Sequence, residues 1–339
     1  MAASKGLPSR IVAGRRVSAI GLGCMNLSHA YGRPPTPEQG RAVLRAALDA
    51  GVTLFDTAAL YGFGANESLV GPVIAPYRQD ILLCSKGGMA GVNFPDGIKR
   101  VIDGRPQAIR RDCEDSLRRL GTDHIDLYYL HRWDKQVPIE ESVGEMVRLK
   151  EQGKIGSLGL SEVSAATLRR ANAVHPIAAL QTEYSPWTRN PEIAVLEACR
   201  DLGTAFVAFS PVARGVLTDT PPDPAAFDAR DIRRSMPRFS PEHYPANLRL
   251  QKGFAAIAAD LGCTAAQLSL AWVLHRGEHI VALPGTTSVD HLREDLAAAH
   301  LVLDAAALAR VEAALNPSLV SGLRYGAQAA SEVDTEEFG

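Results

Sequence analysis

PQAIRRDCEDSLRRLGTDHIDLYYLH, residues 106–131, contains one complete unit of the fold. Its first half repeats apolar residues at helical spacing, at Ile109, Cys113, Leu117 and Leu120. Pro106 is typical of a first helical position and Gly121 of a helix end. The apolar run 125–130 then predicts a buried strand, which His131 ends. A helix that leads into a buried strand is the unit from which α/β folds are built.

The same unit recurs on both sides of this stretch. Upstream, Thr36, Pro37 and Gln39 predict a capped helix that ends at Gly51, before a strand at 52–56. Downstream, the pattern predicts helices over 140–152, from Asn190-Pro191 and from Thr264, and strands at 155–160, 204–209 and 280–283. Apolar runs at 20–24, 81–85 and 178–181 bring the total to about eight strands. Since several are apolar throughout, as parallel strands are, we expect an α/β fold, a (β/α)8 TIM barrel.

The chain is expected to form one barrel domain, residues 1–317, followed by a C-terminal tail, residues 318–339. Segment 10–18, with Ala13-Gly14-Arg15 as its turn, predicts an N-terminal β-hairpin that plugs the bottom of the barrel. The longest irregular stretch, 218–244, is rich in Pro, Asp and Arg, and its length predicts a lid beside the functional site. The polar end, 332–339, is expected either to be mobile or to fold back over that site.

Composition excludes several classes of partner. The net charge of −2, without a basic run, argues against nucleic acid and acidic membranes as partners. No apolar leader or stretch of about 20 apolar residues is present, so we expect a cytoplasmic protein without a membrane span. The 5 cysteines are far apart and form no CxxC pair, which predicts reduced, mostly buried thiols and no metal site.

One glycine-rich motif matches a nucleotide-binding pattern only in part. Gly21-Leu22-Gly23-Cys24-Met25-Asn26 begins like the dinucleotide fingerprint GxGxxG, but Asn26 replaces the third glycine. The residues that follow include Gly32, Pro34 and Pro35, which do not open a helix. A Rossmann domain is therefore not expected.

Four polar residues follow apolar runs and are candidates for chemistry. Asp56, Lys86 and His131 each end a predicted strand, and Tyr61 lies five residues beyond Asp56 in a glycine-rich loop. Because the carboxyl ends of barrel strands meet at one mouth, the four are expected to converge there. An ion pair of Lys86 with Asp56 would lower the pKa of the Tyr61 phenol below its usual value of about 10. Tyr61 would then act as a general acid.

These residues belong to a longer pattern that resembles the aldo-keto reductases, the bacterial and plant subgroup in particular. The pattern comprises Asp56-Thr57-Ala58-(x)2-Tyr61-Gly62, Asn66-Glu67, Lys86-Gly87-Gly88, Ser116-Leu117 through Ile125-Asp126-Leu127-Tyr128 to His131, Gly159-Leu160-Ser161-Glu162, Gln181-Thr182-Glu183-Tyr184-Ser185, Phe209-Ser210-Pro211-(x)2-Arg214-Gly215 and Pro284-Gly285-Thr286-Thr287-Ser288. It runs from Ser18 to about Pro317, so chance is a poor explanation.

The resemblance implies an NADP-dependent oxidoreductase that reduces aldehydes or ketones to alcohols. Tyr61 would donate the proton, Lys86 and Asp56 would tune it, and His131 would orient the carbonyl. NADPH would be held by residues that match the family's cofactor contacts: Ser161, Gln181, Phe209, Ser210, Val212, Arg214, Gly285, Thr286, Thr287, Ser288, His291 and Asp295.

Several of these positions depart from the family pattern. Phe209 stands where Tyr is more usual but keeps the ring face on which a nicotinamide stacks. Thr287 and Ser288 replace the Lys or Arg that many relatives place against the 2'-phosphate, so His291 or Arg293 is expected to supply that charge and NADH use stays open. Asp295 stands where relatives commonly have Asn at the adenine. Glu162, where many relatives have Asn, is expected near the carboxamide.

The small-molecule carbonyl substrate is expected to contact apolar loop residues: Met25, Tyr31, Trp133 and Trp187. Two other classes of function stay open. One is a regulatory subunit like the potassium-channel β-subunits, which share the fold and bind a nucleotide. The other is a barrel hydrolase that uses Asp56, Glu67, His29 and His131 as carboxylates or metal ligands.

Overall fold

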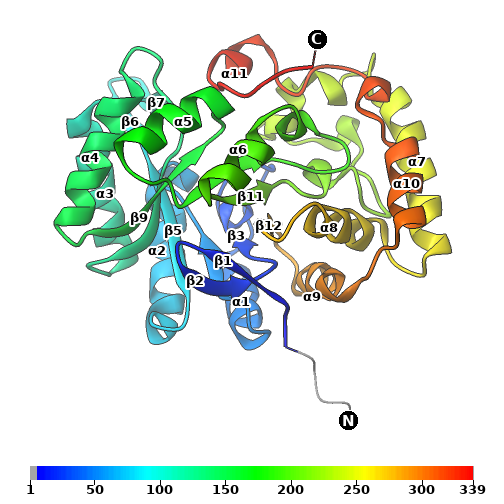
Figure 1. Cartoon of the computed structure of the whole chain (residues 1–339), viewed down its shortest axis with the longest axis horizontal. Helices are drawn as coiled ribbons and strands as arrows, with labels where there is room; N and C mark the ends of the chain where they lie inside the picture. Colours follow the sequence, from blue (N-terminus) through cyan, green and yellow to red (C-terminus); the bar gives the residue numbers. More distant parts are fainter. Residues whose placement is uncertain (1–5, 339) are drawn as a thin grey trace.

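The central element of the fold is a parallel sheet of 8 strands that curls into a barrel (Figure 1). This computed structural model describes residues 6–338. In spatial order the strands are β12 (Ile280–Leu283), β11 (Ala205–Phe209), β10 (Ala179–Glu183), β9 (Ile155–Ser161), β8 (Ile125–Leu130), β5 (Leu82–Gly87), β4 (Leu54–Asp56) and β3 (Leu22–Gly23). A parallel bridge from Ile20 to Ala282, and the Gly23 amide that donates to the Pro284 carbonyl at 2.8 Å, join the two edges. The predicted barrel is confirmed.

Helices follow the strands around the outside of the barrel. They are α1 (Pro37–Asp49), α2 (Ala65–Ile74), α3 (Pro106–Leu120), α4 (Ile139–Glu151), α5 (Ala165–Val174), α6 (Val195–Leu202), α7 (Tyr244–Asp260), α8 (Ala265–His275), α9 (Val289–Ala297) and α10 (Ala305–Ala314). The predicted capping box of Thr36 with Gln39 forms, and the helix predicted from Thr264 begins with a second one, Thr264 with Gln267. The helix predicted from Asn190 begins later, at Val195, because Ala194 has an extended φ of −154° that separates it from a 3-10 turn at Asn190–Glu192.

An N-terminal hairpin closes the bottom of the barrel, as predicted. Strands β1 (Ser9–Val12) and β2 (Arg15–Ser18) pair antiparallel. Ala13 and Gly14 form the turn with positive φ angles of 51° and 72°. Val12 and Val17 are buried in the cluster that fills the lower barrel, together with Leu54, Leu82, Leu127, Val207 and Val281. The hairpin therefore covers the end opposite to the C-terminal tail (Figure 1).

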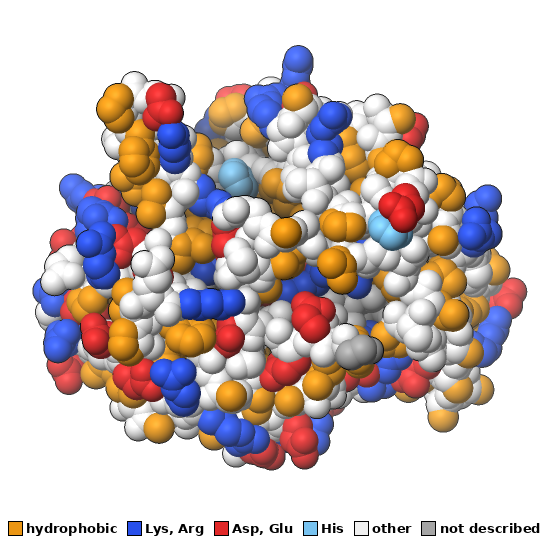
Figure 2. All heavy atoms as spheres, turned by 90° about the horizontal axis from the view of Figure 1, so that it is seen from above, with side chains coloured by type: hydrophobic (Ala, Val, Ile, Leu, Met, Phe, Trp, Pro, Cys, Tyr) orange, Lys and Arg blue, Asp and Glu red, His pale blue; other side chains and the backbone are white. Residues whose placement is uncertain are grey.

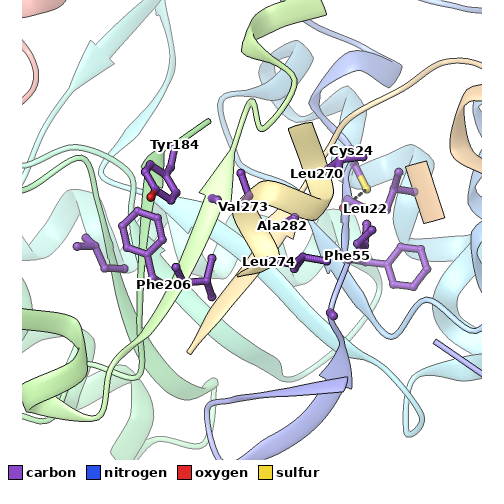
Figure 3. Close-up of a cluster of buried hydrophobic side chains, with 14 of the residues drawn as sticks. Leu22, Cys24, Phe55, Tyr184, Phe206, Leu270, Val273, Leu274 and Ala282 are labelled. Carbon is purple, nitrogen blue, oxygen red and sulfur yellow. Dashed lines mark hydrogen bonds between the residues drawn. The ribbon is translucent and has the colours of Figure 1, made fainter. Parts of the chain in front are cut away.

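The main core lies between the barrel strands and the helices, and Figure 3 shows its part beneath α8. Leu270, Val273 and Leu274 of α8 face Ala282 of β12 and the neighbouring β11. Phe206 of β11 meets the Tyr184 ring edge-on, with 5.8 Å between ring centroids. Burial of such apolar side chains, at roughly 25 cal/mol per Å², is the main stabilising contribution to this packing.

The cysteines are all reduced and mostly lie within this core. Cys24, Cys84, Cys113 and Cys199 are buried, and Cys263 is half-buried. Burial raises the pKa of all five thiols, to about 12 for Cys113 and Cys199. Little reactive thiolate is therefore present near neutral pH.

A second hairpin, absent from the sequence-based expectation, stands above the rim of the barrel. Strands β6 (Met89–Phe94) and β7 (Gly97–Ile102) pair antiparallel directly after β5. Most of their side chains are half-buried or exposed, because the hairpin projects above the barrel (Figure 1). It therefore lacks the apolar alternation by which strands are recognised in a sequence.

The C-terminal tail folds back across the top of the barrel. It contains a short helix, α11 (Ala327–Ser331), which lies above the strands in Figure 1. The Asp334 carboxylate accepts hydrogen bonds from the Ser164 amide at 3.2 Å and the Thr167 hydroxyl at 2.6 Å, at the start of α5. The Lys135 ammonium donates to the Val333 carbonyl at 2.7 Å. The polar end was expected either to be mobile or to fold back over the functional site. Its described part, residues 332–338, folds back.

Within residues 6–338, no single helix has the length and hydropathy to cross a membrane; α7 and α8 reach them only as a pair, bent by 85°.

Candidate active site

A cavity of about 840 Å³ opens at the carboxyl ends of the strands. Figure 2 looks onto this face, where the surface is hollowed beside the projecting β6–β7 hairpin. The wall is formed by strand-end residues, part of the loop 218–236, the hairpin and the tail. The irregular stretch 218–244 thus borders the cavity, as predicted, and contains several 3-10 turns.

Asp56, Tyr61, Lys86 and His131 converge at the floor of the cavity. The fully buried Lys86 ammonium donates to the Asp56 carboxylate, to the Thr57 carbonyl at 3.0 Å and to the Tyr61 hydroxyl at 3.1 Å. The His131 ring lies edge-on to the Tyr61 ring, with 5.7 Å between centroids. After Tyr61, positive φ angles at Gly62 and Phe63 turn the chain sharply into α2.

The electrostatics of this group differ from the sequence-based expectation in one respect. Burial raises the pKa of Tyr61 above its usual value of 10, and the nearby Lys86 ammonium offsets this only partly. Burial disfavours the Lys86 charge, but the Asp56 carboxylate and the Tyr61 hydroxyl together more than compensate, so the pKa of Lys86 is raised. Burial, followed by Lys86 and Arg132, holds the pKa of His131 well below 6.5. Near neutral pH the site thus holds a protonated phenol, an ammonium and a neutral imidazole.

Ten of the twelve predicted cofactor contacts line the cavity: Ser161, Gln181, Phe209, Ser210, Val212, Arg214, Gly285, Thr286, His291 and Asp295. Thr287 borders a smaller neighbouring hollow, and the Ser288 hydroxyl accepts from the His291 amide to cap α9. Arg293 also lies outside the cavity, where its exposed side chain pairs with Asp290 at 3.1 Å. Of the two proposed sources of positive charge, only His291 borders the cavity.

Arg214 lines the cavity and is held by two residues whose roles the sequence did not reveal. Its guanidinium pairs with the buried Glu183 carboxylate at 2.5 Å and donates to the Tyr325 hydroxyl at 3.1 Å. Glu183 belongs to a recognisable motif, but nothing local in the sequence links it to Arg214. Positive φ angles at Ser210, Ala213 and Arg214 shape the loop that carries the guanidinium.

Glu162 binds a residue of the C-terminal tail. It has a positive φ of 57°, and its carboxylate accepts from the Arg324 guanidinium at 2.5 and 3.1 Å and from the Glu183 amide at 2.9 Å. It is not part of the cavity wall. Because Arg324 belongs to the tail, Glu162 fastens the tail to the end of β9. Its expected place near a carboxamide stays a prediction.

Two of the four predicted substrate contacts, Met25 and Tyr31, line the cavity. Trp187 does not, because it is 3% exposed and packs in the main core. Trp133 does not either, since its indole N–H donates to the Val137 carbonyl at 2.9 Å and its ring packs against Arg170. Several other residues line the wall without having been predicted from the sequence: Leu60, Met89, Arg100, Arg132 and Glu332.

The arrangement is a poor one for a hydrolase. Glu67 is buried beneath the site, where its carboxylate binds the Arg119 guanidinium and the Ser85 hydroxyl, both at 2.6 Å. It does not line the cavity, so Asp56 lacks this second carboxylate as a partner. Within residues 6–338, no group of three or more His, Cys, Asp or Glu side chains is placed to hold a metal ion.

The sequence matches the model of the Aldo/keto reductase family over residues 19–316. The chain belongs to this family. The reductase is 40% identical over 319 residues to probable aldo-keto reductase 1 of Glycine max, which covers 92% of this chain and 89% of that protein.

Solved structures agree with this assignment. The glycerol dehydrogenase of Gluconobacter oxydans superimposes on the reductase with a TM-score of 0.82 at 28% identity, covering 91% of this chain and 96% of that one. An aldo/keto reductase of Klebsiella pneumoniae, solved in complex with NADP and acetate, gives a TM-score of 0.68 at 29% identity, covering 94% and 99%. The reductase is thus an oxidoreductase that reduces carbonyl groups with a nicotinamide cofactor.

The cavity of the reductase has the chemistry that such a cofactor needs. Phe209 offers a ring face at the wall, and Ser161 and Gln181 offer a hydroxyl and an amide beside it. The Gln181 amide is itself held by the Asp56 carboxylate at 2.8 Å. Backbone approaches closely at Gly285, where an added Cβ would lie 2.9 Å from the Gly23 carbonyl oxygen. The residues present therefore fit a nicotinamide dinucleotide.

Proposed function

We propose that this reductase uses NADPH to reduce an aldehyde or ketone, with Tyr61 as the proton donor. The observation that carries the proposal is the protonated Tyr61 hydroxyl at the cavity floor, hydrogen-bonded to Lys86 at 3.1 Å and flanked by His131. The bound nicotinamide supplies a hydride to the carbonyl carbon. The carbonyl oxygen takes the proton of Tyr61, so that an alcohol forms.

Each neighbour of Tyr61 has a role in this proton transfer. The Lys86 ammonium stabilises the phenolate that remains after the proton has left. Asp56 keeps Lys86 charged in a site where burial alone would favour the neutral amine. His131, neutral because its pKa is lowered, orients the carbonyl as a hydrogen-bond donor. Raising the phenol pKa keeps Tyr61 protonated until negative charge develops on the substrate oxygen.

Replacing Tyr61 by Phe tests the assignment, since it removes the hydroxyl but keeps the ring. We expect kcat to fall by about 10² to 10⁴ while the Kd for NADPH changes little. Steady-state kinetics with a panel of aldehydes measure the first quantity and tryptophan fluorescence quenching the second. Unchanged turnover in Tyr61→Phe contradicts the mechanism. Tight NADPH binding without turnover of any carbonyl by the wild type would favour a regulatory nucleotide-binding role instead.

The preference for NADPH over NADH is proposed to rest on His291, which borders the cavity at the start of α9. The NADP complex of the Klebsiella pneumoniae relative supports the choice of cofactor. We expect His291→Leu to lose about tenfold in NADPH affinity and to leave NADH affinity nearly unchanged. Arg293→Gln is the matched control, because Arg293 pairs with Asp290 away from the cavity and should alter neither affinity. Equal binding of both cofactors by the wild type would contradict the preference.

A further inference from the structure

Besides the Asp56 carboxylate, which Lys86 neutralises, the cavity wall around Tyr61 and His131 contains two arginines and one carboxylate. They are Arg100 on β7, Arg132 two residues after β8, and Glu332 at the end of α11. The rest of this end is apolar or aromatic: Met25, His29, Leu60 and Met89. Its electrostatic character thus depends on how these three charged groups are paired.

Arg100 is neutralised by the tail. Its guanidinium forms two hydrogen bonds with the Glu332 carboxylate, at 2.6 and 2.5 Å, which join the β6–β7 hairpin to the tail. A bidentate pair of this kind satisfies both charges. At the floor, Lys86 is likewise neutralised by Asp56.

Arg132 has no such partner. One terminal nitrogen, Nη1, donates to the His131 carbonyl at 2.7 Å and to the Ser161 hydroxyl at 3.1 Å. In the part of the chain from residue 6 to residue 338, no carboxylate lies within 4.0 Å of its guanidinium, and Nε and Nη2 donate to no protein acceptor. Arg132 is half-buried and lines the cavity, and its Nε and Nη2 atoms are not fully buried.

The charge of Arg132 also acts on the catalytic side chains. Arg132 lines the same cavity as Tyr61 and His131 and bonds to the His131 carbonyl, and after burial and Lys86 its charge contributes to the lowered pKa of His131. One positive charge without a counter-ion thus lies beside the proton donor, in a partly apolar cavity where a charge–charge contact is strong.

We propose that Arg132 is a specificity-determining residue that selects carbonyl substrates carrying a carboxylate. The inference rests on the proposed function and names the substrate class of that site. The guanidinium offers its remaining N–H groups as a fork that matches the two oxygens of a carboxylate. A single unpaired cation balances a monoanion, whereas a phosphate dianion would need a second cation, and Arg100 is occupied by Glu332.

The test compares the aromatic acids 3- and 4-carboxybenzaldehyde with the corresponding uncharged amides of the same shape. For the wild type we expect kcat/KM to favour at least one acid over its amide by about tenfold or more. In Arg132→Gln the kcat/KM for the acid should fall about 10- to 100-fold more than that for the amide, which shares only the effect of Arg132 on Ser161, Tyr61 and His131. Arg132→Lys, which keeps the charge but not the fork, should retain part of the preference.

Glu332→Gln adds unpaired positive charge where Arg132→Gln removes it. It takes away the carboxylate that neutralises Arg100 at the same end of the cavity. The ratio of acid to amide should stay or rise in this variant, and a fall would contradict an electrostatic origin. Tryptophan quenching by NADPH and turnover of the amide show that each variant is folded.

Three other outcomes are informative. If the wild type reduces acid and amide equally well, the carboxylate subsite is wrong but the proposed reductase function stands. If Arg132→Gln lowers turnover of both substrates equally and raises the KM for NADPH, Arg132 acts by holding Ser161, and the subsite is again wrong. If the wild type reduces neither class of carbonyl while Tyr61→Phe behaves identically, the proposed function itself fails.

Discussion

Burial changes the protonation state of Asp295. It lies on α9 at the cavity wall, at the position where relatives commonly have Asn. Burial, with a smaller contribution from the Glu294 carboxylate, raises its pKa to about 8. At pH 7 the side chain is therefore mostly a neutral carboxylic acid, which can donate and accept hydrogen bonds as an amide does.

This protonation makes a prediction for stability. The folded pKa of about 8 lies above the usual aspartate value of 3.8, so the folded state holds a proton that the unfolded state loses. The contribution of Asp295 to the free energy of unfolding is largest below the unfolded pKa. It falls by roughly 1.4 kcal/mol for each pH unit as the pH rises from the unfolded pKa to the folded pKa. Above the folded pKa it is constant. Asp295→Asn should therefore gain a few kcal/mol relative to the wild type between pH 5 and pH 9. Urea unfolding without cofactor at these two pH values measures the difference, and a pH-independent difference would show that the carboxyl is ionised throughout.

For single residues, the sequence predicts where a side chain lies better than it predicts its protonation or its charge partners. Asp56, Lys86 and His131 were found because each ends an apolar run, and strand ends meet at one mouth. The direction of the Tyr61 pKa shift was predicted wrongly, since it depends on burial by segments far away in the chain. For the same reason the sequence did not show that Trp187 is a core residue or that Arg132 lacks a counter-ion.

Among the elements, the tail is held in place by polar contacts with residues far away in the chain. Its anchor is the buried pair of Glu162 and Arg324, at the end of β9. The two residues are 162 positions apart, so no local pattern predicts their pairing. Regular elements such as β8 and β12 were predicted with correct ends, because their apolar runs are local signals.

Glu162→Gln tests this anchor. Removing one partner leaves the Arg324 charge buried and unpaired, which typically costs about 3–5 kcal/mol. The tail should then detach locally before the barrel unfolds, so amide hydrogen exchange over residues 324–337 should accelerate while the barrel strands stay protected. Arg169→Gln, which removes a surface pair with Asp201, is the control and should change exchange little. Unaltered exchange in the tail of Glu162→Gln would mean that other contacts fasten it.

On the scale of the whole molecule, a barrel is predictable because its unit repeats along the chain. Two layers of core result, one inside the lower barrel and one between strands and helices. The cysteines fall within these layers or at their edge.

Thiol titration checks this distribution. In the native state we expect less than about one equivalent of Ellman's reagent to react within minutes, because thiolate formation is suppressed at every cysteine. In denaturant all 5 thiols should react. Rapid reaction of two or more thiols in the native protein would indicate that the core opens more readily than its packing suggests.

The low reactivity expected of the native thiols also makes the molecule suited to single-site labelling. A cysteine introduced on the exposed tip of the β6–β7 hairpin, as in Lys99→Cys, would be the one fast-reacting thiol without removal of any native cysteine. A fluorescent or spin probe attached there would sit above the cavity mouth. Its signal would report, in real time and on the otherwise unaltered sequence, how the hairpin moves as cofactor and substrate enter and leave.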